Sequence, residues 1–187
     1  MAYRSGTYVA FHADGTNVPG GNSDIDYYYL VKAWSANKDV EFNMIDSHEK
    51  ASSVRDSSLR TTLRNSLLER LRNSKNMLLM VGATTRLDTD WVPFEIEKAV
   101  DEYGIPLIVA YTKISAPIRQ PSLLSSLWPL ALASRISNKT ACAIHVPFKQ
   151  EPIHDAITRF SHDNLPGGGS GLAIYTDDAY RSFGIDG

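Results

Sequence analysis

The sequence predicts an α/β fold in which helices flank an open, mostly parallel sheet of four to five strands. Short apolar runs alternate along the chain with amphipathic stretches, and this alternation favours parallel strands joined by crossover helices. The 187 residues are enough for one domain with its own core. The expected topology is therefore flavodoxin-like, with ligands bound beyond the carboxyl ends of the strands.

Each element follows from a local pattern. The five apolar runs expected to form strands are 6–13, 41–47, 76–83, 106–112 and 142–148. The expected helices are 27–37, 59–73 and 91–104, with 154–164 as a candidate last helix. In the second helix, leucines recur at three- and four-residue spacing, which predicts a core-facing stripe with the arginines in solvent: Leu59, Leu63, Leu67, Leu68 and Leu71. Three prolines indicate loop and short helix in 114–141.

The C-terminal composition suggests a domain boundary. We expect residues 1–164 to form the α/β domain. Residues 165–187 begin with the glycine-rich LPGGGSG, which is typical of a connector or mobile tail. They are therefore expected to be a C-terminal tail or extension.

Composition excludes several classes of function. The formal net charge is −2, with 43% hydrophobic and 21% charged residues, so neither nucleic acid nor an anionic membrane is an expected partner. The single cysteine, Cys142, permits no internal disulfide and no cysteine-based zinc cluster. No apolar run approaches the roughly 20 residues that cross a bilayer. A cytoplasmic location is the expectation.

Topology indicates where a ligand would bind. For the strand order 2-1-3-4-5, the switch point lies between the first and third strands. A ligand is therefore expected to contact the loops after Phe11 and Gly82. The pocket candidates are Phe11, His12, Gly82 and Thr84, together with Asp46 at the end of the second strand. For Asp46 an ordinary turn at a strand end is an equal alternative.

Several types of active site are excluded because a residue that each one requires is missing. His12 replaces the aspartate nucleophile of a haloacid dehalogenase phosphatase, and the glycines of the first loop do not match dinucleotide or Walker spacings. A receiver-type phosphoacceptor would need an aspartate where Gly82 ends the third strand. His145 and His154 lack metal-ligand spacing, so no metal site is expected. Asp24 is interpreted, with Asp26, as an N-terminal helix charge.

Glu95 is the residue whose place on a predicted helix says most about a possible active site. If 91–103 is helical, its buried stripe is Val92, Ile96, Ala99, Val100 and Tyr103. Glu95 then lies beside that stripe, one turn after Trp91, on a rim where a side chain faces a cleft. The alternative is a first-turn carboxylate that the helix dipole favours.

The pattern as a whole resembles a TIR domain, and within that family the TIR-like group that includes the ThsB proteins of Thoeris antiphage systems. Phe11-His12 follows the first strand, Asp46 ends the second, and MLLMVG forms the third. The specific element is Trp91-Val92-x-Phe94-Glu95-Ile96, which begins a helix directly after the third strand. The resemblance covers about residues 7–112. Many TIR domains carry serine where this chain has His12.

This resemblance implies an enzyme that consumes NAD. In NAD-consuming TIR domains the glutamate of this motif is catalytic, and it corresponds to Glu95 here. Cleavage of the nicotinamide–ribose bond passes through an oxocarbenium-like state, which an ionised carboxylate stabilises. Nicotinamide leaves without protonation, so the pKa of Glu95 need not be raised. The candidate substrate contacts are Phe11, His12, Asp46, Gly82, Thr84 and Trp91.

The resemblance also sets expectations about the biological system. NAD is a substrate and no cofactor is required; the product is ADP-ribose, a cyclic isomer or a conjugate. Self-association, a phage-derived trigger and a separate effector reached through the nucleotide signal are the expected partners. The alternatives are a non-catalytic TIR-like interaction module and, more weakly, a flavodoxin-like nucleotide binder.

Overall fold

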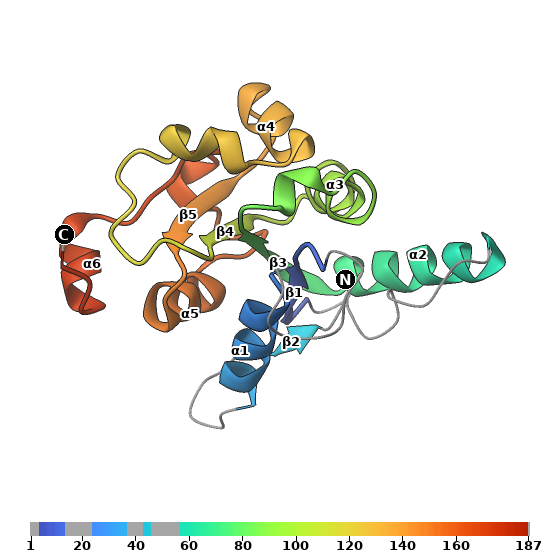
Figure 1. The fold of residues 1–187 in the computed structure, drawn as a ribbon, viewed down its shortest axis with the longest axis horizontal. Helices are drawn as coiled ribbons and strands as arrows, with labels where there is room; N and C mark the ends of the chain where they lie inside the picture. The colour runs from blue at the N-terminus through green and yellow to red at the C-terminus, as the bar shows by residue number, and fades with distance from the viewer. Residues whose placement is uncertain (1–3, 14–23, 37–42, 46–56, 187) are drawn as a thin grey trace.

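The computed structural model describes residues 4–13, 24–36, 43–45 and 57–186. Within them the sheet has five strands, all parallel, in the order β2-β1-β3-β4-β5 (Figure 1). This confirms the predicted α/β fold and its 2-1-3-4-5 strand order. The strands are β1 (Gly6–Ala10), β2 (Met44–Ile45), β3 (Ser74–Val81), β4 (Leu107–Tyr111) and β5 (Ala143–Pro147).

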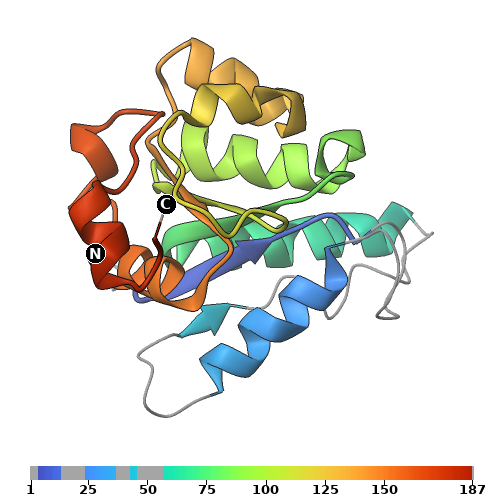
Figure 2. The same cartoon turned by 60° about the vertical axis from the view of Figure 1, so that its left-hand side comes forward.

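Helices cover both faces of this sheet, so its central strands are buried on both sides. The helices are α1 (Ile25–Ser35), α2 (Ser57–Arg72), α3 (Trp91–Glu97), α4 (Leu130–Ser137), α5 (Gln150–Arg159) and α6 (Asp177–Ser182). One hydrophobic cluster joins α2, α3 and α4 to the sheet, and a second joins α1, α5 and α6 to it. Figures 1 and 2 show α3 and α4 on one side and α1 and α5 on the other.

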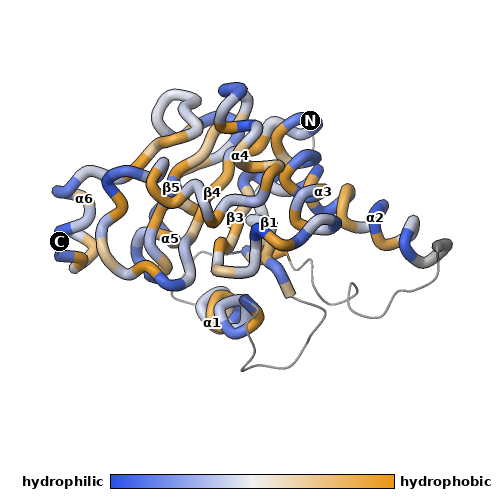
Figure 3. Tube along the Cα trace, turned by 45° about the horizontal axis from the view of Figure 1, so that its top comes forward, coloured by the Kyte–Doolittle hydropathy of each residue, from blue (hydrophilic) through white to orange (hydrophobic). Residues whose placement is uncertain are grey.

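Local sequence explains the central strands. Residues 77–81 of β3 are apolar and at most 1% exposed, as expected for a parallel strand covered on both faces. In β1, Tyr8 and Ala10 belong to the cluster with α3, whereas Val9 belongs to the cluster with α1, because successive side chains alternate between faces. Figure 3 shows apolar residues concentrated along these central strands.

The predicted helix 91–104 changes geometry part-way. α3 is α-helical only to Glu97 and continues as a π-helix, Lys98–Glu102. The Tyr103 amide donates to the Lys98 carbonyl, five residues earlier. Gly104 then ends the helix at a φ of 59°. A π-helical segment of this kind is found most often beside functional sites.

Predicted helix boundaries differ from the structure by a few residues, whereas the segment 114–141 holds loop and short helix as expected. The candidate helix 154–164 begins earlier, at Gln150, and ends at Arg159, because Pro152 is tolerated in a first helical turn. The segment 114–141 holds a 3-10 helix, Pro121–Leu127, followed by α4. No helix among the described residues is long and apolar enough to span a membrane.

The glycine-rich C-terminal segment packs along β5. The Ala143 amide donates to the Ser170 carbonyl at 3.0 Å, and the His145 amide donates to the Ala173 carbonyl at 2.9 Å. Beyond this point, Tyr180 is only 1% exposed. Residues 165–186 thus lie against the sheet, although the boundary between residues 164 and 165 stays a prediction.

Candidate functional site

Polar side chains gather at the carboxyl edge of the sheet, where the switch point lies. His12 follows β1, Gly82 follows β3 and Thr112 follows β4. Carboxyl ends of parallel strands meet at one edge, so residues distant in the sequence become neighbours there. Glu95 reaches the same face of the sheet as Tyr8, from α3.

Glu95 is buried and hydrogen-bonded to a tyrosine of the first strand. The Tyr8 hydroxyl donates to Glu95 Oε1 at 2.5 Å, and Glu95 is only 5% exposed. The expectation that it lies on an open rim is therefore wrong. Positions 92, 95, 96 and 99 all face the sheet, and the Tyr8 hydroxyl supplies the polar partner that a buried carboxyl group requires.

This burial changes the acidity of Glu95. Loss of hydration raises its pKa from 4.5 to about 8, despite the Tyr8 hydrogen bond, which lowers the pKa. The negative charge of Asp88 raises the pKa further. The Glu95 carboxyl group is therefore mostly protonated at neutral pH, which differs from the expectation that its pKa need not be raised.

Asp88 links His12 to the start of α3. Its Oδ1 accepts hydrogen bonds from the Asp90 amide at 2.8 Å and the Trp91 amide at 3.0 Å. Its Oδ2 lies 3.2 Å from His12 Nδ1. These contacts fix the first turn of the helix that carries Glu95. Asp88 was not among the residues predicted for the site, although an aspartate just before a helix is a capping signal in the sequence.

Asp24 occupies the switch point itself. The Thr85 hydroxyl donates to its Oδ2 at 2.7 Å, and the Thr112 hydroxyl donates to its Oδ1 at 3.3 Å. Asp24 is 3% exposed, and burial raises its pKa. Asp24 is the N-cap residue of α1 and Asp26 lies in its first turn, as expected of N-terminal helix charges, but the Asp24 carboxylate makes no capping hydrogen bond there. The side chain instead ties α1 to the ends of β3 and β4.

Gly82 allows this close approach. Its amide donates to Thr85 Oγ1 at 2.7 Å. A Cβ atom at position 82 would overlap Asp24 Oδ1 and lie 2.9 Å from Thr112 Oγ1. The position therefore accepts no larger residue without displacement of the buried carboxylate.

We expect Gly82→Ala to lower the free energy of unfolding by about 1–3 kcal/mol, because an added methyl group overpacks a filled site. Urea unfolding of the variant and the parent protein measures this change. In an Asp24→Ser background the same replacement should cost less, since the overlapping carboxylate is gone. An identical cost in both backgrounds would show that Asp24 is not the cause.

The other residues predicted to contact the substrate lie in different environments. Phe11 packs at a centroid distance of 4.7 Å on Tyr28 in the hydrophobic cluster of the opposite face, so the structure places it in the core. Thr84 precedes the turn that holds Thr85. Trp91 is partly buried against the cluster that contains Tyr8. Asp46 lies outside the described residues.

The region around these residues matches a known family. A family model described as the TIR-like domain of the Thoeris protein ThsB matches residues 8–116, which is more than half of the chain. The chain belongs to the ThsB TIR-like family. The matched range begins at Tyr8 and includes Asp24, Gly82, Asp88 and Glu95.

Membership in the ThsB TIR-like family assigns a role in antiphage defence. Membership in a Thoeris family implies a defence system that has further components. Among the described residues no three histidine, cysteine, aspartate or glutamate side chains are grouped to hold a metal ion.

Proposed function

We propose that this ThsB TIR-like chain cleaves the nicotinamide–ribose bond of NAD, with Glu95 as the catalytic residue. The observation that carries the proposal is the buried carboxyl group of Glu95, which Tyr8 of β1 holds on the α3 face of a TIR-like sheet. A buried carboxyl group with a strongly perturbed pKa is a candidate for catalysis.

One carboxylate is sufficient for this reaction. The bond between C1′ and the pyridinium nitrogen breaks, and its electron pair neutralises nicotinamide as it leaves. Positive charge develops on the ribose, where ionised Glu95 stabilises it. The lone pair of a nucleophile then forms the new bond to C1′, and a water or hydroxyl nucleophile releases its proton. Water gives ADP-ribose, a nucleophile within the same molecule gives a cyclic isomer, and another small molecule gives a conjugate.

Substrate binding and ionisation of Glu95 are coupled in this proposal. The positive charge of the nicotinamide ring favours the ionised carboxylate, which offsets the effect of burial. Tyr8 holds Oε1, so Oε2 is the atom proposed to meet the ribose hydroxyls. Because Glu95 is 5% exposed, the carboxyl group or the residues over it must move to admit the ribose.

Tyr8→Phe should lower kcat/KM for NAD at pH 7 by about tenfold, because the Tyr8 hydroxyl lowers the pKa of Glu95 and one pKa unit corresponds to a factor of ten in the ionised fraction. The parent activity should rise with pH towards about 8, and the variant should need a higher pH. Rates of nicotinamide release from pH 6 to 9 measure both effects.

Tyr175→Phe is the matched control for Tyr8→Phe. Tyr175 is also a mostly buried tyrosine that donates to a carboxylate, Asp155 Oδ2, at 2.5 Å. It lies in the cluster on the other face of the sheet. The control should keep the pH profile of the parent protein. Identical profiles for Tyr8→Phe and the parent would contradict a role of Tyr8 in setting the acidity of Glu95.

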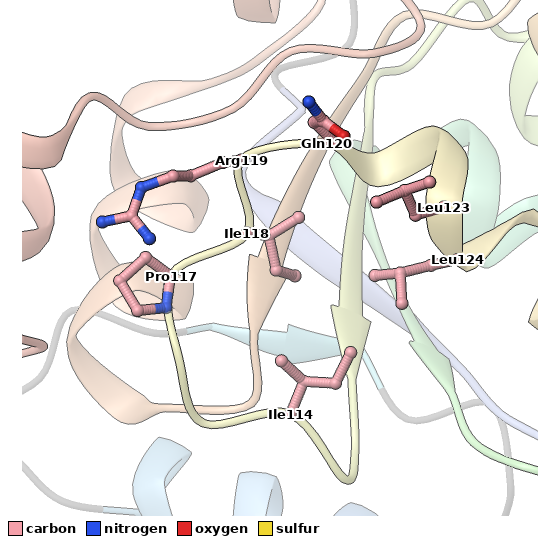
Figure 4. A pocket seen from close by; sticks show the side chains of 7 residues that line it. All are labelled: Ile114, Pro117, Ile118, Arg119, Gln120, Leu123 and Leu124. Carbon is pink, nitrogen blue, oxygen red and sulfur yellow. The ribbon is translucent and has the colours of Figure 1, made fainter. Parts of the chain in front are cut away.

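A protein-interaction module is the second candidate function, and one surface favours it. Leu123 is 75% exposed and Leu130 is 82% exposed. Leu123 lines a hollow of about 410 Å³ after β4, in which Ile118 and Leu124 point toward one another while Arg119 points away (Figure 4). Exposed apolar surface of this kind often marks a binding site for another protein.

The deciding experiment mixes purified protein with NAD, with and without phage-derived factors and at concentrations that favour self-association. Release of nicotinamide supports the enzyme, and mass analysis of the product separates hydrolysis, cyclisation and conjugation. The product is proposed to act in the cytoplasm as a signal for a separate effector. Failure to release nicotinamide under all these conditions, with a partner protein still bound, would favour the interaction module.

A further inference from the structure

Two arginines of α2 lie over the helix that carries Glu95. Arg60 and Arg64 are one turn apart, and their guanidinium groups lie 5.4 and 5.9 Å from the centroid of the Trp91 ring. Arg64 also lies 5.1 Å from the ring of Phe94. Arginine stacks readily on aromatic faces, which holds the planar group in a defined orientation.

The two guanidinium groups carry more charge than their acidic partner neutralises. Arg60 forms an ion pair with Asp90, and Arg64 Nη2 lies 3.3 Å from the same carboxylate. In the part of the chain that the structure describes, Asp90 is the acidic partner of both. Arg64 Nε is buried there with no hydrogen-bond partner. The arginine side chains are 46% and 42% exposed, so an anion in solution can reach them.

The spacing between the arginine pair and Glu95 matches the spacing between the pyrophosphate and the reacting carbon of a nicotinamide dinucleotide. Trp91 precedes Glu95 by four residues, which is about one helical turn, or roughly 6 Å along the axis. In a nicotinamide dinucleotide, the pyrophosphate is joined to C5′ of the ribose whose C1′ reacts. One sugar therefore separates the reacting carbon from the phosphates, and one helical turn separates Glu95 from the residue beneath the arginines.

We propose that Arg60 and Arg64 bind the pyrophosphate of the dinucleotide and thereby place the nicotinamide ribose at Glu95. This inference rests on the proposed function. Guanidinium groups suit phosphate because their parallel N–H donors match its oxygen atoms. Phosphate oxygens replace the Asp90 carboxylate as partners, while Trp91 keeps the guanidinium planes oriented. These arginines are binding and positioning residues, and Glu95 remains the catalytic one.

The competing explanation is an ion-pair cluster that only fastens α2 to α3. Such a cluster affects stability, but it cannot depend on whether a ligand carries phosphate. Exposed ion pairs contribute little to stability, so the two explanations differ in what they predict for ligands. The test therefore compares ligands that share the nicotinamide ribose and differ in phosphate.

The experiment measures NAD cleavage by the parent protein and by Arg60→Ala, Arg64→Ala and the double variant. We expect KM for NAD to rise about tenfold or more per arginine, as for the loss of a charged hydrogen bond, with kcat changed less than KM. Nicotinamide riboside, which has no phosphate, serves as a competitive inhibitor and should keep its inhibition constant. Lysine at either position should give an intermediate KM, because it keeps the charge without the planar fork.

Arg159→Ala is the matched control. Arg159 also pairs with a carboxylate, Asp155, at 2.9 Å, but it lies on α5, on the other face of the sheet. This variant should keep the parent KM. An unchanged KM for NAD in the double variant, or an equal loss of affinity for nicotinamide riboside, would overturn the phosphate subsite.

Calorimetry with inorganic pyrophosphate separates failure of the subsite from failure of the proposed function. The parent protein should bind pyrophosphate, and the double alanine variant should bind at least tenfold more weakly. Such binding in a protein that never cleaves NAD would support the subsite while refuting catalysis. Equal binding of pyrophosphate to both proteins, or binding to neither, would overturn the subsite even if NAD is cleaved.

Discussion

Glu95→Gln is expected to abolish measurable release of nicotinamide from NAD, with a loss of at least about a hundredfold, while the protein stays folded. The amide matches the shape of the carboxyl group and still accepts the hydrogen bond from Tyr8. It carries no negative charge to stabilise the oxocarbenium-like state, and removal of such a stabilising group costs about 10²–10³ or more in rate. Chromatographic detection of nicotinamide measures the effect.

Glu97→Gln provides the matched control. Glu97 lies two residues further along α3 and is exposed to solvent, so its replacement removes the same charge from the same helix without touching the buried site. This control should retain parent activity. Equal turnover by Glu95→Gln and the parent protein would refute the catalytic assignment.

The same Glu95→Gln replacement should stabilise the protein at neutral and alkaline pH. The pKa of Glu95 is about 8 in the folded chain, against an ordinary value of 4.5. Between these values the folded state binds a proton that the unfolded state has released. The free energy of unfolding of the parent protein therefore falls as pH rises through this window, by up to about 1.4 kcal/mol per pH unit.

Glutamine at position 95 removes this dependence on pH. At pH 7 the stabilisation relative to the parent should be on the order of 3 kcal/mol, because 7 lies about 2.5 units above the ordinary glutamate value. The advantage should be fully developed above about pH 8 and vanish near pH 4.5. Urea unfolding of both proteins at several pH values measures it, with Glu97→Gln as the reference. A difference that stays constant from pH 5 to 8 would contradict the raised pKa.

Glu95→Gln is thus expected to lose activity and to gain stability, and this combination is typical of functional sites. The buried Glu95 beside Tyr8 is expected to make the fold less stable at neutral pH than a neutral amide would, and natural proteins retain such groups where activity depends on them. A variant that is at once more stable and inactive would therefore be strong support for catalysis at Glu95.

Local pattern was sufficient for most of the architecture. The apolar run that forms β3 and the leucine spacing of α2 reflect contacts repeated every few residues, so they can be read from the sequence. The same holds for the position of α3 directly after β3. Boundaries were less predictable: the candidate helix 154–164 spans Gln150–Arg159, and the helix begun at Trp91 becomes π-helical after Glu97.

The candidate site was predictable in identity but not in geometry. The WVPFEI pattern was enough to single out Glu95, and topology was enough to direct attention to His12 and Gly82. Neither could reveal that Asp24 contacts Thr85 and Thr112, which lie 61 and 88 residues further along the chain. Contacts at such separations depend on how strands align across the sheet, and a single sequence contains no local signal for them.

The sequence by itself determined the fold class and the glutamate at the start of α3, because these depend on hydrophobic periodicity and on a short motif, and the strand order was expected from the flavodoxin-like class. Only the tertiary structure decided the environment of that glutamate. Its burial, its hydrogen bond to Tyr8 and its raised pKa arise where α3 packs on a strand that is 87 residues away in the sequence. Acidity depends on the hydration and charges around a group in space, and those are set by packing.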